Sequence, residues 1–324
     1  MNESIMAPTA RRLVEKVLAV RPGERVLLLT DPTRPASITQ ALARAISAAG
    51  GELALMYMDP VTMGGVEPPG HVAAAMKASE CIYLQGSFAA THTDAVREAL
   101  TAGARVVDIW GFEEEMMTVG GAVADYEEIG GITRKLGERL NAAREGRFTT
   151  PDGCDMTFSL EGRECVEFNG IAAEPGQITA CPDGEGAIGP VEGSAEGVMV
   201  NPVSVEHGEL GFVSEPMRLE VSGGYVKSVT GSPTAERFWR ILEEGGNAAC
   251  NIAEFAVGTN PGCRKSVTLR EAKTAWGTCH MAVGDNRTLG GSIFAPLHVD
   301  MIFHHPTVWL DEQIIVRDGE IVGL

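Results

Sequence analysis

The chain is 324 residues long, with 44% hydrophobic residues, 22% charged residues and a formal net charge of −18. This length exceeds what a single hydrophobic core usually organises, so two domains are expected. The acidic balance, without a cluster of basic residues, argues against nucleic acid or an anionic membrane as a partner, because both would be repelled.

The N-terminal residues and the cysteines predict a cytoplasmic protein. The segment MNESIMAPTARRLVEKVLAV carries charges through its apolar stretch and lacks the hydrophobic segment of a signal peptide. No run approaches the roughly 18 apolar residues of a membrane span. The seven cysteines are scattered without a Cys-x-x-Cys pair, which is typical of reduced thiols and not of a disulfide scaffold or a zinc ribbon.

Residues 1–146 alternate between amphipathic helical patterns and short, continuously apolar strands. Such strands are typical of a parallel sheet with helices on both faces, so this part predicts a doubly wound α/β domain. No glycine follows the first strand in Thr30-Asp31-Pro32-Thr33-Arg34, so no dinucleotide cofactor is expected. The expected helices span residues 8–20, 37–49, 71–78, 93–102 and 126–145, and the expected strands span residues 24–31, 52–59, 81–84 and 105–109.

Residues 147–324 have a different texture, rich in glycine and proline. Short alternating segments at residues 199–202, 217–221 and 313–316 are bounded by turn signals, and a single helical pattern covers residues 235–244. This half is therefore expected to be a mixed α+β domain dominated by antiparallel strands.

Polar residues suited to metal binding gather in glycine-punctuated, apolar parts of this second half. His298 and Asp300 are two residues apart, so on a strand both side chains would point to the same face. A carboxylate and a histidine that converge beside a second histidine, His280, are ordinary ligands of a transition metal. Spacing alone is weak support, because an isolated His-x-Asp is more often structural.

The types of these residues and their order along the chain are more informative about function than their spacing. The motifs run from Pro182-Asp183-Gly184-Glu185 through Glu215-Pro216-Met217, Ala253 to Asn260, Glu271-x-Lys273, Gly277 to Asn286, Gly290-Gly291 and His298-x-Asp300 to Asp318-Gly319. In that order they resemble the thermophilic metallo-aminopeptidase family of aminopeptidases T and S. The resemblance covers the C-terminal half, whereas the N-terminal half shares only its helix–strand rhythm and the segment from Arg21 to Val26.

This resemblance implies a homodimeric hydrolase with two divalent metal ions, which would be zinc, cobalt or manganese. Carried over by position, the metal ligands would be Glu185, Glu254, His280, His298 and Asp300. Glu254 would bridge the ions and act in catalysis, because two metals about 3.5–4 Å apart share a bridging carboxylate and a reactive water. The expected reaction is cleavage of an amide bond in a small molecule or short peptide.

One departure from the family pattern leaves alternatives open. Where the peptidases carry a catalytic tyrosine, this chain has Arg287, which cannot deprotonate but could hold a substrate carboxylate or stabilise an oxyanion. The same superfamily includes a ring-cleaving dioxygenase of 2,5-dihydroxypyridine with one non-haem iron(II), for which His280, His298 and Asp300 would suffice. The presence of both Glu185 and Glu254 favours two metals. A third reading is a binding module or inactive relative that keeps its metal for structure.

Overall fold

The computed structural model describes residues 3–324, and its contacts divide the chain into two compact units. The first unit comprises Met1–Gly130, Phe168–Asp183 and Gly262–Arg264, and the second comprises Gly131–Glu167, Gly184–Pro261 and Lys265–Leu324. The chain therefore returns to the first unit twice. The domain boundary expected after residue 146 stays a prediction about separable folding domains.

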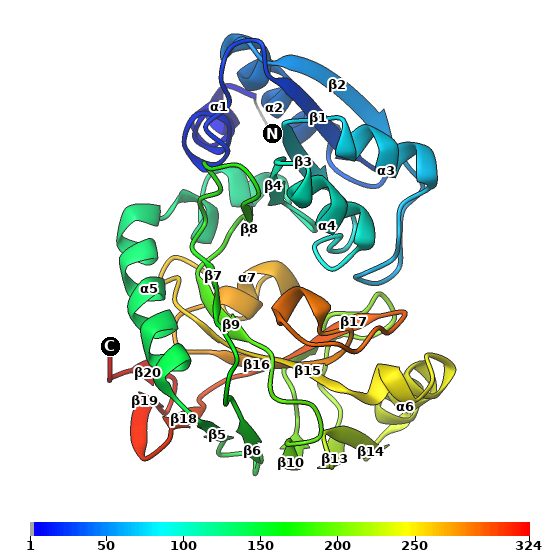
Figure 1. Cartoon of the computed structure of the whole chain (residues 1–324), viewed down its shortest axis with the longest axis vertical. Coiled ribbons are helices and arrows are strands. Elements are labelled where there is room, and N and C mark those ends of the chain that lie inside the picture. The colour runs from blue at the N-terminus through cyan, green and yellow to red at the C-terminus, as the bar shows by residue number, and fades with distance from the viewer. Residues whose placement is uncertain (1–2) are drawn as a thin grey trace. The chain divides into compact units, whose positions relative to one another are not determined.

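The first unit is built on a parallel sheet, in agreement with the predicted doubly wound fold (Figure 1). Its strand order is β2-β1-β3-β4-β8, and each adjacent pair is parallel. The strands are β1 (Arg25–Thr30), β2 (Glu52–Tyr57), β3 (Cys81–Gln85), β4 (Arg105–Asp108) and β8 (Ile178–Ala180). The helices are α1 (Glu3–Arg12), the π-helical turn η1 (Leu13–Val17), α2 (Ala36–Ala48), α3 (Gly70–Lys77), α4 (Asp94–Thr101) and the 3-10 turns η2 (Glu114–Met117) and η3 (Gly121–Val123).

Alternate side chains of β1 point to opposite faces of this sheet. Val26 and Leu28 lie in one apolar core with side chains of α1 and α2, whereas Leu27 and Leu29 lie in a second core with side chains of α3 and α4. Both faces are thus covered, which is why the sequence of these strands is continuously apolar. Two details differ from expectation: the first helix begins earlier and ends in a π-helical turn, and β8 joins the sheet from the second half of the chain.

The second unit contains two sheets, a seven-stranded one ordered β12-β11-β17-β16-β15-β9-β7 and an eight-stranded one ordered β14-β13-β10-β6-β5-β18-β19-β20. The strands of the first are β7 (Val166–Phe168), β9 (Glu185–Ile188), β11 (Ser204–Val205), β12 (Gly211–Phe212), β15 (Ile252–Gly258), β16 (Cys279–Gly284) and β17 (His298–Phe303). Those of the second are β5 (Glu145–Thr149), β6 (Asp155–Ser159), β10 (Glu196–Val200), β13 (Arg218–Ser222), β14 (Tyr225–Thr230), β18 (Thr307–Leu310), β19 (Gln313–Arg317) and β20 (Glu320–Ile321). The remaining helices are α5 (Tyr126–Ala142), which crosses from one unit to the other, α6 (Pro233–Glu244), α7 (Leu269–Thr274), and the 3-10 turns η4 (Asn247–Cys250) and η5 (Arg287–Leu289).

Aromatic side chains join the two sheets of the second unit. Phe255 of β15 lies with its ring centroid 4.8 Å from that of Phe158 on β6 and 5.9 Å from that of Phe148 on β5. Phe303 of β17 also packs against Phe148, with centroids 5.4 Å apart. Because these rings are buried, one face of the seven-stranded sheet is committed to this core. Functional side chains on the same strands must therefore use the opposite face.

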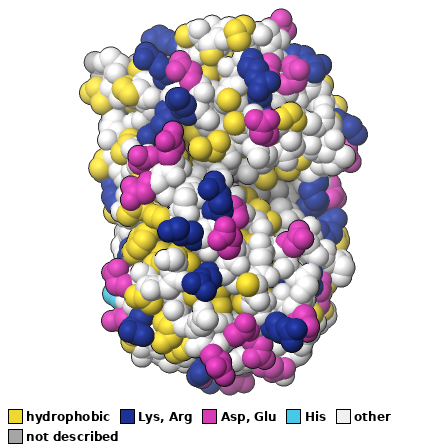
Figure 2. Space-filling view, turned by 60° about the vertical axis from the view of Figure 1, so that its left-hand side comes forward, with side chains coloured by type: hydrophobic (Ala, Val, Ile, Leu, Met, Phe, Trp, Pro, Cys, Tyr) yellow, Lys and Arg dark blue, Asp and Glu magenta, His cyan; other side chains and the backbone are white. Residues whose placement is uncertain are grey.

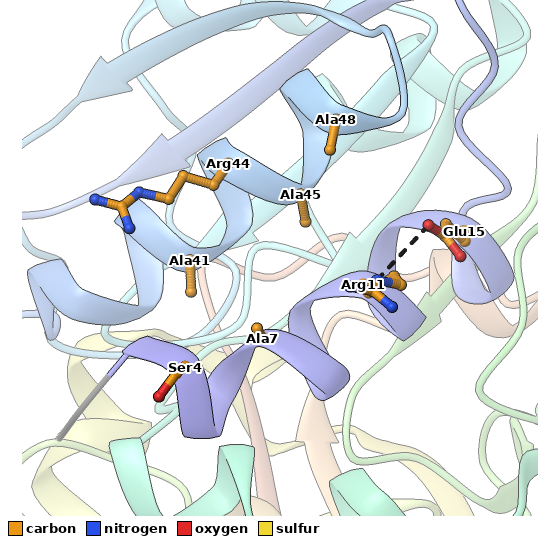
Figure 3. A pocket seen from close by; sticks show the side chains of 8 residues that line it. All are labelled: Ser4, Ala7, Arg11, Glu15, Ala41, Arg44, Ala45 and Ala48. Carbon is orange, nitrogen blue, oxygen red and sulfur yellow. Dashed lines mark ion pairs between the residues drawn. The ribbon is translucent and has the colours of Figure 1, made fainter.

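The surface carries charges of both signs, and the first unit has a groove between two of its helices. Figure 2 shows acidic and basic side chains interspersed on the face that it displays. A shallow groove between α1 and α2 is lined by alanines, with Arg11, Glu15 and Arg44 at its rim (Figure 3). The Nε atom of Arg11 lies 4.0 Å from Glu15 Oε1, which is a surface ion pair of small energetic weight. Among the described residues, no helix is long and apolar enough to span a membrane.

Candidate metal centre

The five residues expected to bind metal all lie in the second unit, on four neighbouring strands of its seven-stranded sheet. Glu185 begins β9, Glu254 is on β15, His280 is on β16, and His298 and Asp300 are on β17. Strand register places them on one face: Asp300 is paired with Ala282, and Ala282 is paired with Glu254. Side chains opposite one another across a ladder point to the same side. This is the face that points away from the phenylalanine core, since Phe255 and Phe303 are the odd-numbered neighbours along the same strands.

Small residues separate the functional side chains on this face. Ala256 is paired with His280 on one side and with Ala187 on the other, and Gly258 is paired with Glu185. Residues with short or no side chains at these positions leave the carboxylates and imidazoles free to lean toward one another. The sequence pattern of large polar residues alternating with alanine and glycine is therefore a consequence of building the site on a flat sheet surface.

Glu254 lies at the centre of the group. Its Oε1 atom is 3.1 Å from Nε2 of His280, and its Oε2 atom is 3.0 Å from Nε2 of His298. His280 Nε2 is also 3.9 Å from Oε2 of Glu185. Glu185, Glu254 and His280 can each offer one ligand atom within 4.8 Å of the others. All three side chains are buried, as a metal centre shielded from water requires.

The hydrogen bonding of His298 shows that this arrangement needs a cation. Its Nδ1 atom lies 2.7 Å from the backbone carbonyl oxygen of Asp285, which can only accept, so Nδ1 carries a proton. A neutral His298 then presents the lone pair of Nε2 to a carboxylate oxygen of Glu254, and two acceptors face each other. Either a second proton or a metal ion must lie between them. The donor set therefore fits a metal ion, and the carbonyl of Asp285 fixes the ring in the tautomer that ligates through Nε2.

The pKa values of the pair agree with this description. Burial by itself disfavours the charged imidazolium, but the hydrogen bonds and negative charges of Asp300 and Glu254 outweigh it and raise the pKa of His298 to about 10. Burial would raise the pKa of Glu254, yet the ammonium of Lys273 and the hydrogen bonds from both histidines hold that pKa below its ordinary value. The site thus concentrates negative charge and attracts positive charge.

Lys273, on α7, brings a positive charge to the same group. Its Nζ atom lies 2.7 Å from Oδ2 of Asp300 and 3.6 Å from Oε1 of Glu185. Burial would lower the pKa of Lys273, but Asp300 and then Glu185 raise it well above the ordinary value, so the ammonium stays charged. The sequence indicated Lys273 as a residue that orients metal ligands or contacts substrate, but not that it contacts Asp300 on β17, because nothing local predicts that contact.

Glu206 lies beside Asp300, and the sequence analysis did not identify it. It follows β11, and its backbone N–H donates to the carbonyl of Asp300 over 2.9 Å. Burial, and after it the charge of Asp300, raises the pKa of Glu206 well above the ordinary value. A signal was present in the sequence, since a lone glutamate after the apolar segment Val203-Ser204-Val205 must be neutral or paired if it is buried.

Arg287, expected to act in catalysis, contacts Asp285, the residue that follows strand β16. Its Nε atom donates to Oδ2 of Asp285 over 2.8 Å, its backbone N–H donates to Oδ1 over 3.0 Å, and its guanidinium lies 4.6 Å from the ring centroid of Phe294. Asp285 is also the residue whose carbonyl orients His298. A role for Arg287 in contact with substrate stays a prediction.

Comparisons with known proteins identify a family and several proteins that this chain resembles. A family model described as 2,5-dihydroxypyridine 5,6-dioxygenase matches residues 10–323. A curated protein of that name from Pseudomonas putida KT2440 is 24% identical over 199 residues, which span 57% of this chain and 56% of that protein. The aligned part thus covers little more than half of the relative.

Two solved structures share the fold over the full length. The structure of 2,5-dihydroxypyridine dioxygenase from Pseudomonas putida KT2440 has a TM-score of 0.85 at 17% identity, covering 100% of this chain and 99% of that one. Wild-type AmpT from Thermus thermophilus has a TM-score of 0.72 at 18% identity, covering 99% of this chain and 100% of the other. At such identities the likeness shows the fold alone.

Proposed function

Because the chain belongs to the 2,5-dihydroxypyridine 5,6-dioxygenase family, we propose that it is a ring-cleaving dioxygenase that acts on a dihydroxylated pyridine with one iron(II) ion. The observation that supports this proposal most directly is the pair of buried histidines that flank Glu254, at 3.1 and 3.0 Å. Two imidazoles and one carboxylate are the donor set of mononuclear non-haem iron oxygenases.

The expectation of an aminopeptidase-like metallohydrolase is wrong. The family model spans nearly the whole chain, and both it and the curated relative carry the dioxygenase name, which is the alternative that the sequence had left open. The argument for hydrolysis rested on the presence of both Glu185 and Glu254. Those carboxylates do lie together with His280, but they do not by themselves require two ions. The expected pair of zinc, cobalt or manganese ions therefore gives way to one iron(II).

We assign the ion to His280, His298 and Glu254. The sequence gave Asp300 the place of the carboxylate in this set. Glu254 lies within hydrogen-bonding distance of both imidazoles, whereas Asp300 has Oδ1 at 3.3 Å from Nε2 of His298 alone and Oδ2 at 2.7 Å from Nζ of Lys273. Iron(II) in this donor set would supply the redox chemistry of ring oxygenation and open positions for two reactants. His280, His298 and Glu254 would hold the ion away from bulk water, and the carbonyl of Asp285 fixes the tautomer of His298.

Oxygen uptake tests this function. Protein purified without chelator would be loaded anaerobically with iron(II) and mixed with 2,5-dihydroxypyridine in oxygenated buffer. We expect one dioxygen consumed per ring, loss of the aromatic ultraviolet band, and both atoms of ¹⁸O₂ in the ring-opened product. Aminoacyl amides should remain intact. Fully iron-loaded protein that leaves the pyridine unchanged would refute the assignment, whereas turnover of the amides would restore the hydrolase.

The partners of the chain stay predictions. A small-molecule substrate follows from the proposed reaction, and the homodimer expected from the resemblance is tested by the mass of the protein in light scattering. A mass of twice 34.3 kDa is the expected result. A monomeric mass at all concentrations would contradict it.

A further inference from the structure

The strand β2 lies at the edge of the parallel sheet of the first unit and is exposed along its whole length. It pairs with β1 on one side, and within residues 3–324 no strand pairs with its other side (Figure 1). Every residue from Glu52 to Tyr57 is at least partly exposed, whereas five of the six residues of β1 are buried. The outer side of β2 is thus open to another strand.

Backbone hydrogen bonds show which residues of β2 face this open side. The N–H of Glu52 donates to the carbonyl of Glu24 over 2.8 Å, and the N–H of Met58 donates to the carbonyl of Thr30 over 3.0 Å. The even-numbered residues therefore point their backbone groups toward β1. Successive residues of a strand point these groups to opposite sides, so the odd-numbered residues present theirs to the open side. They are Leu53, Leu55 and Tyr57.

The side chains of β2 lack the features that usually keep an edge strand from pairing. Natural edge strands carry lysine or proline, contain a bulge, or are covered by another segment. β2 has one charged residue, Glu52 at its first position, and its other five residues are apolar. Leu55 and Tyr57 point to the same face and are 43% and 56% exposed. An apolar and unpaired edge of this kind favours the addition of another strand.

A second copy of the chain supplies a strand that fits this edge. Two β2 strands related by a two-fold axis run antiparallel, and the contact closes after two chains, whereas pairing with a different edge would leave another β2 open. The odd-numbered residues of the two copies must face each other, because they carry the free backbone groups. The register that uses all of them places Leu55 opposite Leu55 of the second copy and Leu53 opposite its Tyr57.

Side chains and charges agree with this register. Ala54 lies opposite Met56 of the second copy, so apolar residues also meet on the other face. Glu52 lies opposite Met58 of the second copy and not opposite an acidic residue, and Arg25 is its partner on β1. The low charge of this edge matters because the chain has a net charge of −18, and two copies repel each other wherever their facing surfaces are acidic.

We propose that two copies of the chain pair through β2 in this antiparallel register, so that their parallel sheets join into one continuous sheet. About six N–H···O bonds form across the two-fold axis, two for each facing pair of odd-numbered residues. The pairing also covers Leu55 and Tyr57, which a single chain leaves exposed. The proposal concerns assembly and is independent of the reaction that the metal centre performs.

Substitutions at Leu55, the residue on the two-fold axis, test the proposal. Leu55→Pro removes the N–H that donates to the second copy, yet it costs no hydrogen bond to β1, because this N–H faces the open side. Leu55→Lys and Leu55→Glu each place like charges directly opposite one another. Val119→Lys is the matched control, since Val119 lies outside the sheet in the same unit and is 42% exposed.

The molar mass of each protein would be measured by light scattering over a range of concentrations, with folding checked by circular dichroism. We expect twice 34.3 kDa for the wild type and Val119→Lys, and 34.3 kDa for each Leu55 variant. An equimolar mixture of Leu55→Lys and Leu55→Glu should form dimers again, because opposite charges then meet on the axis. The amides of Leu53, Leu55 and Tyr57 should exchange hydrogen slowly in the wild type and fast in Leu55→Lys.

Four results would overturn the proposal. Folded Leu55 variants that remain dimers place the interface elsewhere. Lysine and glutamate variants that are monomeric and do not associate with each other contradict the register. A wild type that is monomeric at all concentrations means that the edge stays open or accepts a strand of another protein. A dimeric wild type whose three amides exchange fast contradicts pairing through β2, and this measurement decides even if no Leu55 variant folds.

Discussion

His298 and Glu254 face each other across 3.0 Å, nitrogen to oxygen, while the other ring nitrogen of His298 is held by a backbone carbonyl. A neutral imidazole in this orientation has no proton to give to the carboxylate. The contact is stable only with a cation between the two groups or on the ring.

Glu254→Gln should abolish oxygen uptake while the fold survives. Glutamine keeps the shape of the side chain but removes the charge that binds the ion between the two histidines. Because changes even to outer partners of a ligand cost 10–100-fold, we expect a loss of iron affinity of at least about 100-fold. Affinity would be measured by titration and folding by circular dichroism, with exposed Glu220→Gln on β13 as control. Unchanged turnover at full iron loading would refute the role of Glu254.

Arg287→Lys tests whether this arginine acts on substrate. Lysine keeps the charge but cannot reproduce the planar fork of the guanidinium that contacts Asp285 and the Phe294 ring. We expect kcat/KM for the dihydroxypyridine to fall by about tenfold, as for the loss of one oriented hydrogen bond, while bound iron per chain is unchanged. Loss of iron in parallel with activity would show instead that Arg287 acts only by positioning Asp285.

Gly284→Ala should destabilise the strand that carries His280. Gly284 has a φ of +113°, and a Cβ atom there would lie 2.1 Å from the carbonyl oxygen of Leu297. The strained backbone and the clash with a main-chain atom predict a loss of about 3 kcal/mol in the free energy of unfolding. The measurement is urea denaturation of metal-free protein.

Gly290→Ala provides the control for this prediction. Gly290 also has a positive φ, of +78°, but nothing lies within 4 Å of its added Cβ atom. Its substitution should cost about 1 kcal/mol, from backbone strain alone. Equal losses for the two glycines would show that the close approach to Leu297 is unimportant.

Glu192→Gln should make stability less dependent on pH in acid. Burial would raise the pKa of Glu192, but the backbone N–H of Ser292, the amide of Asn286 and the charge of Arg163 outweigh it and lower the pKa to about 2. A depressed carboxyl pKa stabilises the fold above the unfolded value, and this stability is lost as pH falls from about 4.5 toward 2. Urea denaturation should therefore show a smaller loss across this window in Glu192→Gln than in the wild type. Parallel pH profiles would contradict the ion pair.

The sequence by itself determined the strands in which the order of apolar and polar residues reflects which faces are buried. Continuous apolar runs such as Val26 to Leu29 predicted a parallel sheet, because each residue of a strand covered on both faces must be apolar. The two-residue spacing of His298 and Asp300 predicted a shared face, and the strand β17 places them so. These are properties of neighbouring residues, and local geometry suffices for them.

Only the tertiary structure decided which distant charges meet. The entry of Ile178–Ala180 into the first sheet, the approach of Glu206 to Asp300 and the reach of Lys273 from α7 to β17 depend on pairing between segments far apart in the chain. For the same reason the order of the expected ligands along the chain does not contain their contacts. Glu254 lies within 3.1 Å of both imidazoles, whereas Asp300 contacts Lys273 and His298.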